Sequence, residues 1–213
     1  MAELVVCLHG WWMPTREVAL VRSRLQQHHG FDARLFGYPS VRRTLDESAH
    51  SLIEFLRSLD ADRVHLVGHS LGGIVALRAL ALAPNLPGGR VVCLGSPLCG
   101  SKAAQSLHRY GWGRLLLGKA LPDATLRQST VAWASSVVVQ REVGVIAGNA
   151  AAGLGRLFAR FDEPNDGTVA VAETRLPGIT DHLVLDVSHT GMVFSNPVVE
   201  QAAAFLSEGA FRR

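Results

Sequence analysis

The sequence predicts an α/β protein whose mostly parallel sheet of about six strands is covered by helices on both faces. Short apolar runs rich in β-branched residues alternate along the chain with segments in which apolar residues recur at helical spacing. Strands separated by helices pair in parallel, and burial on both faces explains why the runs are almost continuously apolar. A length of 213 residues, 48% of them hydrophobic, suits one domain with a proper core. The predicted strands are residues 3–8, 32–36, 63–67, 90–94, 143–147 and 183–187.

The helices are predicted from apolar spacing together with signals at their ends. They span residues 15–28, 44–59, 71–83 and 196–207. Gly30 stops the first, and Thr44 opens the second with Glu47 three residues on, which is a capping box. Asn196 is a side-chain cap for the last helix, with Pro197 at the first helical position.

Composition narrows the class of protein. A formal net charge of +3 is too mild for nucleic-acid binding, and the basic residues are scattered along the chain. The first ten residues have neither a basic leader region nor an apolar stretch long enough for a signal peptide or a membrane span. We therefore expect a cytoplasmic protein without stable membrane insertion. Three cysteines are an odd number, and two fall in predicted strands or at their ends, which makes a disulfide framework unexpected.

The central motif is a glycine-flanked serine between the strand at 63–67 and the helix at 71–83. Residues 68–72 read Gly-His-Ser-Leu-Gly and fit the G-x-S-x-G nucleophile elbow, in which a strained turn raises the serine hydroxyl above the sheet. Glycines on either side let strand and helix approach where a Cβ would clash. A phosphate-binding loop is excluded because no lysine follows Gly72. The alternative is a glycine-rich turn of any doubly wound protein.

A serine hydroxyl is a weak nucleophile and needs a base that a third group orients. Active sites of such sheets lie beyond the carboxyl ends of the strands, and the expected chain order is serine, acid, histidine. His189 follows the last predicted strand directly and is the expected general base for Ser70. His69 adjoins the nucleophile and cannot easily fold back onto it. The remaining histidines are assigned to solvated helix faces, strands or loops.

Several carboxylates between the last two predicted strands compete for the role of the acid. Asp166 is preferred because it stands in the loop Asn165-Asp166-Gly167-Thr168-Val169. Asp-Gly is also a common turn dipeptide, so Asp166 could simply form a turn. Asp162 is held in reserve.

An oxyanion hole requires two backbone donors aimed at the developing charge. The Leu71 amide, directly after the nucleophile, is one expected donor, and the Trp11 amide in the loop after the first strand is the other. Trp12 and His69 are the candidate substrate-binding side chains. The two tryptophans could line an acyl pocket or only anchor their loop.

These motifs together resemble the α/β-hydrolase superfamily, in particular compact bacterial lipases and esterases and the lipase-like domain of GPI inositol-deacylases. The similar segments are residues 9–10, 68–73, 95–101, 165–169 and 188–191. Ser96 and Leu98 replace the threonine and histidine that such lipases usually carry in Gly-Thr-Pro-His-x-Gly-Ser. The resemblance implies a minimal α/β-hydrolase fold and the hydrolysis of an ester or thioester through an acyl-enzyme.

Residues 101–140, here called the cap segment, are a long insert in the predicted single domain of residues 1–213. Loops of this length are usually functional or contain helices of their own. The cap segment combines leucines and aromatic residues with five lysines and arginines against the single acid Asp123. This composition would suit transient contact with a lipid or an acyl carrier. It would equally suit an ordinary covering helix with one solvated basic face.

The predicted function is a serine hydrolase that cleaves carboxylic esters with Ser70, His189 and Asp166. Three alternatives remain open, namely a thioesterase, an acyltransferase using the same triad, and a non-catalytic ligand-binding module on a hydrolase scaffold. No metal-ligand cluster is apparent in the sequence, and the triad chemistry needs no metal or other cofactor.

Overall fold

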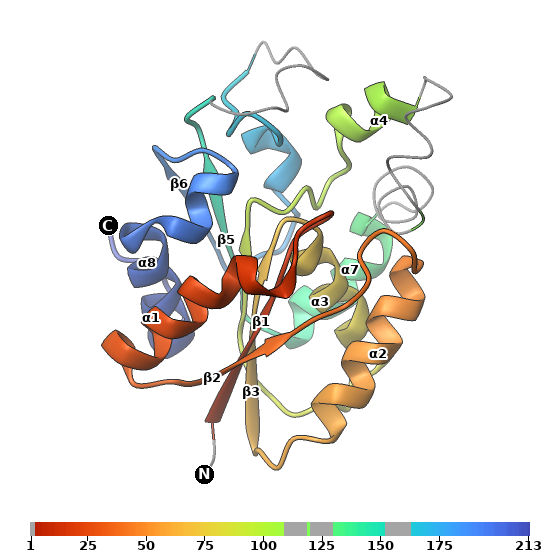
Figure 1. The fold of residues 1–213 in the computed structure, drawn as a ribbon, viewed down its shortest axis with the longest axis vertical. Coiled ribbons are helices and arrows are strands. Elements are labelled where there is room, and N and C mark those ends of the chain that lie inside the picture. Colours follow the sequence, from red (N-terminus) through yellow and green to blue (C-terminus); the bar gives the residue numbers. More distant parts are fainter. Residues whose placement is uncertain (1–2, 109–118, 120–129, 152–162) are drawn as a thin grey trace.

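The computed structural model describes residues 3–108, 119, 130–151 and 163–213. These residues form a six-stranded sheet in the order β2-β1-β3-β4-β5-β6, in which every neighbouring pair is parallel. The predicted α/β class and parallel sheet are therefore confirmed (Figure 1). The strands are β1 (Glu3–Leu8), β2 (Asp32–Phe36), β3 (Arg63–His69), β4 (Val91–Leu94), β5 (Val143–Gly148) and β6 (Asp181–Leu185).

Helices cover both faces of this sheet. On one face lie α2 (Leu45–Arg57), α3 (Leu71–Leu82) and α7 (Thr130–Gln140). The other face is covered by α1 (Ala19–His29) and α8 (Asn196–Glu208), which are on the opposite side of the sheet in Figure 1. The described residues also include α4 (Lys102–His108) and the 3₁₀ turns η1 (Thr15–Val18), η4 (Val171–Thr174) and η5 (Thr190–Phe194). Among the described residues, none of the helices has the length and apolarity needed to cross a membrane.

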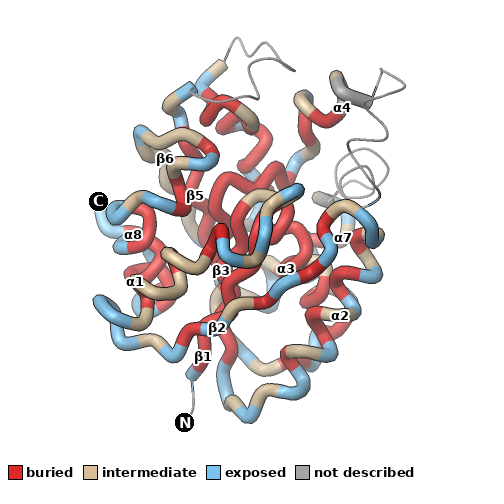
Figure 2. Tube along the Cα trace, in the orientation of Figure 1, coloured by how far each residue is buried: buried red, intermediate tan, exposed pale blue. Residues whose placement is uncertain are grey.

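The central strands supply both halves of the core because successive side chains point to opposite faces. In β1, Leu4, Val6 and Leu8 pack towards α2 and α3. Val5 and Cys7 of the same strand pack towards α1 and α8. Figure 2 shows the buried residues concentrated along the strands and on the sides of the helices that meet them. This double burial explains why the strand sequences are apolar runs without alternation.

Several predicted boundaries differ from the structure by one or two residues, and the helix predicted over residues 15–28 is divided into η1 and α1. Two of the differences have a clear physical reason. β6 covers residues 181–185 instead of 183–187, because its partner β5 ends at Gly148, which pairs with Leu185. The apolar run continues to Val187, whose carbonyl accepts from the Ala150 amide at 3.3 Å beyond the end of the paired strands. α8 is capped by Ser195, whose Oγ accepts a hydrogen bond from the Val198 amide, and Asn196 lies inside the helix. The capping box of Thr44 and Glu47 at the start of α2 is as predicted.

The cap segment is described only in part. α4 lies near its beginning, and residues 109–118 and 120–129, which include most of the predicted apolar and basic side chains, lie outside the described residues. α7 forms the end of the segment and packs against α3, with Ala134 and Val137 buried in the core. Trp133 of α7 lies under the guanidinium of Arg78, 5.2 Å from ring centroid to Cζ.

The start of α3 lies so close to β3 that the backbone leaves no room for a Cβ at Gly68. A Cβ added to Gly68 would lie 2.3 Å from the Gly73 nitrogen and 2.5 Å from the Gly72 carbonyl carbon. Both are backbone atoms and cannot rotate away. We expect Gly68→Ala to lower the free energy of unfolding by about 1–3 kcal/mol. In a domain of this size each kcal/mol corresponds to roughly 2–4 °C in Tm, so a thermal melt measures the loss.

Gly88→Ala is the matched control, since a Cβ at Gly88 meets no atom within 4 Å. Its Tm should be unchanged or slightly raised, because alanine reduces the entropy of the unfolded chain. Equal melting temperatures for Gly68→Ala and wild type would contradict the steric account.

Candidate active site

Ser70 lies at the junction of β3 and α3, above the carboxyl ends of the strands. Its backbone has φ +53° and ψ −120°, a conformation rare for a residue with a Cβ. The Ser70 amide donates to the Leu94 carbonyl at 2.8 Å, which ties the turn to the end of β4. Such strain persists only where the surrounding structure enforces it, and it is concentrated at functional sites. The local geometry is that of a nucleophile elbow.

His189 and Asp166 form a buried pair at the same edge of the sheet. His189 Nδ1 and Asp166 Oδ2 are 2.7 Å apart, and the Asp166 side chain is 1% exposed. Asp166 Oδ1 accepts from the amides of Thr168 and Val169 at 2.9 and 2.7 Å. The His189 amide also donates to the Asp166 carbonyl at 2.9 Å. A carboxylate held this way accepts the Nδ1 proton, so the neutral imidazole presents Nε2 as the acceptor.

Contacts through neighbouring residues bring this pair beside Ser70. The space where Gly95 would carry a Cβ is bounded by His189 Nδ1 at 3.1 Å and Asp166 Oδ2 at 3.2 Å. Gly95 directly follows Leu94, the residue that accepts from the Ser70 amide. The structure therefore brings Ser70, Asp166 and His189 together, whereas Asp162 lies outside the described residues.

The loop after β1 runs close to Ser70. A Cβ on Gly10 would lie 3.2 Å from the Ser70 Cβ. His9 fixes the start of this loop, since its Nδ1 contacts the Gly10 carbonyl at 2.9 Å and its Nε2 accepts from the Tyr38 amide at 3.2 Å. The Tyr38 hydroxyl donates to the His9 carbonyl at 2.8 Å. Burial holds the pKa of His9 below its ordinary value, which keeps the ring neutral for this double role.

Trp11 and Trp12 follow at the exposed side of the same loop. Trp12 has φ +58°, which is unusual for a bulky residue, and its amide donates to Ser40 Oγ at 3.2 Å. Its side chain is 56% exposed, while Trp11 is half-buried against the core. The Trp11 amide directly follows Gly10, and the Leu71 amide directly follows Ser70. Both predicted oxyanion donors thus belong to segments that border Ser70.

Glu17 is the site residue that the sequence prediction missed. It lies in η1, its Oε2 accepts from the Gly10 amide at 2.9 Å, and its Oε1 is 2.8 Å from His69 Nδ1. The His69 ring is also buried, and its Nε2 contacts the His189 carbonyl at 3.1 Å. A signal was present, because Glu17, Val21 and Leu25 are spaced four apart and so would share the apolar face of the helix predicted over residues 15–28.

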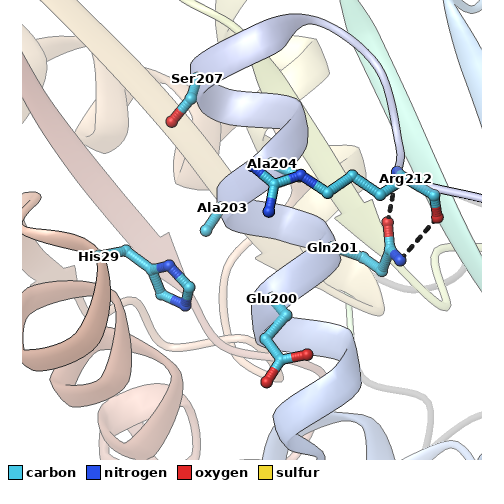
Figure 3. Close-up of a pocket in the computed structure, with 7 residues that line it drawn as sticks. All are labelled: His29, Glu200, Gln201, Ala203, Ala204, Ser207 and Arg212. Atoms are coloured by element: carbon cyan, nitrogen blue, oxygen red, sulfur yellow. Dashed lines mark hydrogen bonds between the residues drawn. The ribbon is translucent and has the colours of Figure 1, made fainter.

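Two hollows lie away from this edge of the sheet. One, of about 540 Å³, lies along α8 near His29, where Gln201 makes two hydrogen bonds with the Arg212 backbone (Figure 3). The other, of about 370 Å³, lies near Arg63 and Arg90 at the amino ends of the strands. Binding sites of parallel sheets lie at the carboxyl ends, so neither hollow is the candidate site. Within the described part of the chain, no three His, Cys, Asp or Glu side chains are grouped to hold a metal ion.

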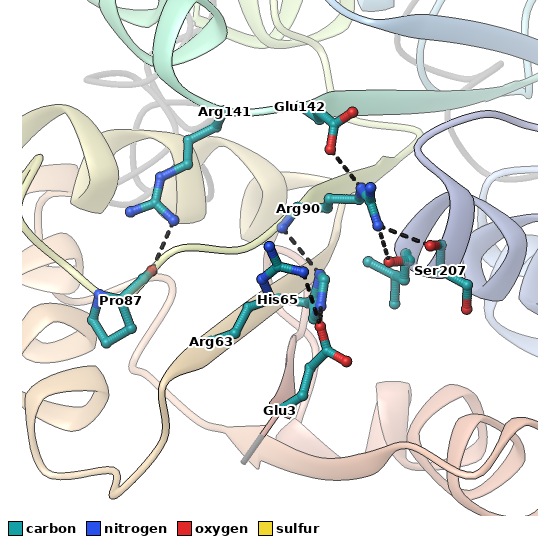
Figure 4. A network of polar contacts seen from close by, with 9 residues as sticks. Glu3, Arg63, His65, Pro87, Arg90, Arg141, Glu142 and Ser207 are labelled. Atoms are coloured by element: carbon teal, nitrogen blue, oxygen red, sulfur yellow. Dashed lines mark hydrogen bonds and ion pairs between the residues drawn. The ribbon is translucent and has the colours of Figure 1, made fainter. Parts of the chain in front are cut away.

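A third carboxylate–histidine pair lies near the smaller hollow, at the amino ends of β1 and β3 (Figure 4). His65 Nε2 is 2.8 Å from Glu3 Oε1, and His65 Nδ1 accepts from the Arg90 amide at 3.0 Å. An acceptor at Nδ1 and a donor at Nε2 describe a neutral ring. Burial lowers the pKa of His65 in agreement with this. The Arg90 guanidinium pairs with Glu142 at 2.6 Å.

Comparison with solved structures gives the same fold. A lipase of Bacillus licheniformis in its mature form superposes with a TM-score of 0.76 at 19% identity, over 98% of this chain and 92% of that one. A carboxyl esterase from a metagenome gives 0.68 at 20% identity, over 89% and 65% of the two chains. A hydrolase from Oleispira antarctica gives 0.68 at 11% identity, over 97% and 91%. At these identities the likeness concerns the fold.

The sequence itself carries a family signature. A search of the curated proteins found no match to the chain. The model of the family described as "Alpha/beta hydrolase family", however, matches residues 5–205, which include most of β1, the serine turn, the Asp166–His189 pair and most of α8. The expected resemblance is confirmed, and the chain belongs to the alpha/beta hydrolase family.

Proposed function

We propose that the protein is a serine hydrolase that cleaves carboxylic esters, with Ser70 as nucleophile, His189 as general base and Asp166 as the group that orients His189. The observation that carries the proposal is the buried Asp166–His189 pair, 2.7 Å between Oδ2 and Nδ1, beside a serine in a strained turn. Membership of the family and the fold shared with lipases and esterases support a hydrolase.

The proposed reaction has two halves. Ser70 Oγ attacks the acyl carbonyl carbon while its proton passes to His189 Nε2, and the resulting imidazolium is stabilised by Asp166. When the tetrahedral intermediate collapses, the bond to the leaving alcohol breaks and His189 returns the proton to that oxygen. Water then attacks the acyl-enzyme with His189 again as base, which releases the carboxylic acid and restores Ser70.

The Leu71 and Trp11 amides are the proposed oxyanion donors. Leu71 is the first residue of α3, so the positive end of the helix dipole supports negative charge at the same point. Trp12 is a proposed substrate contact because its exposed ring belongs to the loop over Ser70. We also propose that residues 1–213 form one domain and that the cap segment covers the site. Its apolar and basic composition favours substrates with an acyl chain, including those presented by a lipid or an acyl carrier.

The test combines a fluorophosphonate probe with p-nitrophenyl esters and thioesters of graded acyl length. We expect the folded wild type to incorporate the probe at Ser70 and to turn over esters. Ester turnover should fall in proportion to the fraction of protein that has reacted with the probe. Addition of an alcohol separates hydrolysis from acyl transfer, because a transferase would produce the new ester. A folded protein that neither incorporates the probe nor turns over any ester would support a binding module instead.

A further inference from the structure

Next to the proposed site lies another buried acid–imidazole pair, which the proposed triad does not use. Glu17 Oε1 and His69 Nδ1 are 2.8 Å apart, and their side chains are 2% and 3% exposed. The two residues come from η1 and from the last position of β3, so the contact joins segments that are far apart in sequence. The carboxylate is as deeply buried as the one in the triad.

The contacts of this pair indicate which His69 ring nitrogen carries a hydrogen. His69 Nε2 faces the His189 carbonyl at 3.1 Å, and since a carbonyl oxygen only accepts, Nε2 carries hydrogen. Burial by itself would raise the pKa of Glu17, but the contacts with His69 and with the Gly10 amide outweigh it and lower that pKa. The lowered pKa favours the ionised form of Glu17, so a buried carboxylate lies against the imidazole ring.

Three parts of the proposed site meet at the Glu17–His69 pair. The Gly10 amide donates to Glu17 Oε2, and the next amide in the chain is that of Trp11. His69 is the residue before Ser70, and its ring lies 4.8 Å from the ring of His189. The Glu17–His69 pair thus connects the loop over the nucleophile, the nucleophile turn and the backbone of the general base.

Stability alone is a poor explanation for such a pair. Removing a carboxylate from water carries a desolvation cost, and apolar residues of similar volume often stabilise a protein as well or better. Orientation explains it better, because displacement of a reacting or stabilising group by about 1 Å can cost roughly 10²-fold in rate.

We propose that Glu17 and His69 are positioning residues, which hold the Gly10–Trp11 backbone and the His189 backbone at the separation from Ser70 that ester cleavage requires. This inference rests on the proposed function. It replaces the substrate contact predicted for His69, because both ring nitrogens face protein atoms.

Variants of Glu17 separate positioning from charge. Glu17→Ala removes both contacts and should lower kcat about 10- to 100-fold with KM nearly unchanged. Glu17→Gln should restore most of that loss, since its carbonyl can accept from Gly10 and its amide can donate to a neutral His69. Glu17→Met fills the same space without polar atoms and should behave like Glu17→Ala, which keeps the test valid if the alanine variant fails to fold.

Glu3→Ala is the matched control. It removes the other carboxylate that lies 2.8 Å from a histidine, at the opposite ends of the same two strands. We expect its kcat to remain near the wild-type value. A kcat near wild type for folded Glu17→Ala or Glu17→Met, or a Glu17→Gln enzyme as slow as Glu17→Ala, would overturn the inference.

Hydrogen exchange of the Gly10 amide distinguishes this failure from failure of the proposed function. The exchange rate should rise in Glu17→Ala and Glu17→Met and remain unchanged in Glu3→Ala, whether or not esters are turned over. Unchanged exchange in the Glu17 variants overturns the positioning role. A wild type without esterase activity, but with the expected exchange pattern, overturns the proposed function and, with it, the catalytic purpose of the pair.

Discussion

Ester turnover should fall about 10⁶-fold when Ser70 is replaced by alanine, and by a similar factor for His189→Ala. The proposed chemistry needs both groups in one step, because the hydroxyl is a poor nucleophile until Nε2 accepts its proton. The double variant should therefore be no slower than either single variant. Steady-state hydrolysis of p-nitrophenyl esters measures kcat, and fluorophosphonate incorporation reports the nucleophile independently.

Matched controls for these variants lie close by. Ser96 is a fully buried serine just beyond β4, and His182 is a half-buried histidine within β6, whose Nε2 contacts Thr174 Oγ1 at 2.8 Å. Ser96→Ala and His182→Gln should keep most of the wild-type activity. If Ser70→Ala still reacted with the probe while Ser96→Ala did not, the nucleophile would be misassigned.

Asp166→Asn should cost about 10⁴-fold in kcat, the loss expected when the base is held in the wrong tautomer. An asparagine can still accept the Thr168 and Val169 amides through its Oδ1, so its NH₂ group would face His189 Nδ1. The imidazole would then accept at Nδ1 and carry its proton on Nε2, the nitrogen that must take the proton from Ser70. The substitution would thus preserve the position of the side chain but block proton transfer from Ser70 to His189.

The comparison variant is Asp162→Asn, at the other carboxylate considered from sequence. It should retain wild-type kcat, and circular dichroism should show both variants folded. Loss of activity in Asp162→Asn together with normal activity in Asp166→Asn would show that the acid is misassigned.

The fold could be predicted from the sequence because its determinants are local. Each buried strand is a short apolar run, and helix ends carry recognisable signals such as the Thr44–Glu47 box. The site residues were predicted from motif and chain order, and the structure brings three of them to one edge. Glu17 could not be assigned this way, since its partners, Gly10 and His69, are set by how η1 folds back over β1 and β3.

The end of β6 and the capping residue of α8 were predicted wrongly for a related reason. The end of β6 is decided by where β5 stops and not by its own apolar run, which continues to Val187. At α8, two successive residues could cap the helix. Ser195 and not Asn196 is the cap because of the path that the backbone takes from η5 into α8. Contacts of this kind follow from tertiary structure, which a local pattern does not contain.

The backbone of Ser70 has a consequence beyond chemistry. Its positive φ is unfavourable because of the Cβ, which alanine shares, so the conformational penalty belongs to having any side chain at this position. The Ser70 hydroxyl needs this Cβ to carry it above the sheet. Part of the folding free energy of β3, β4 and α3 therefore offsets the strain at Ser70, so maximal thermostability and the proposed role as nucleophile place opposing requirements on this residue.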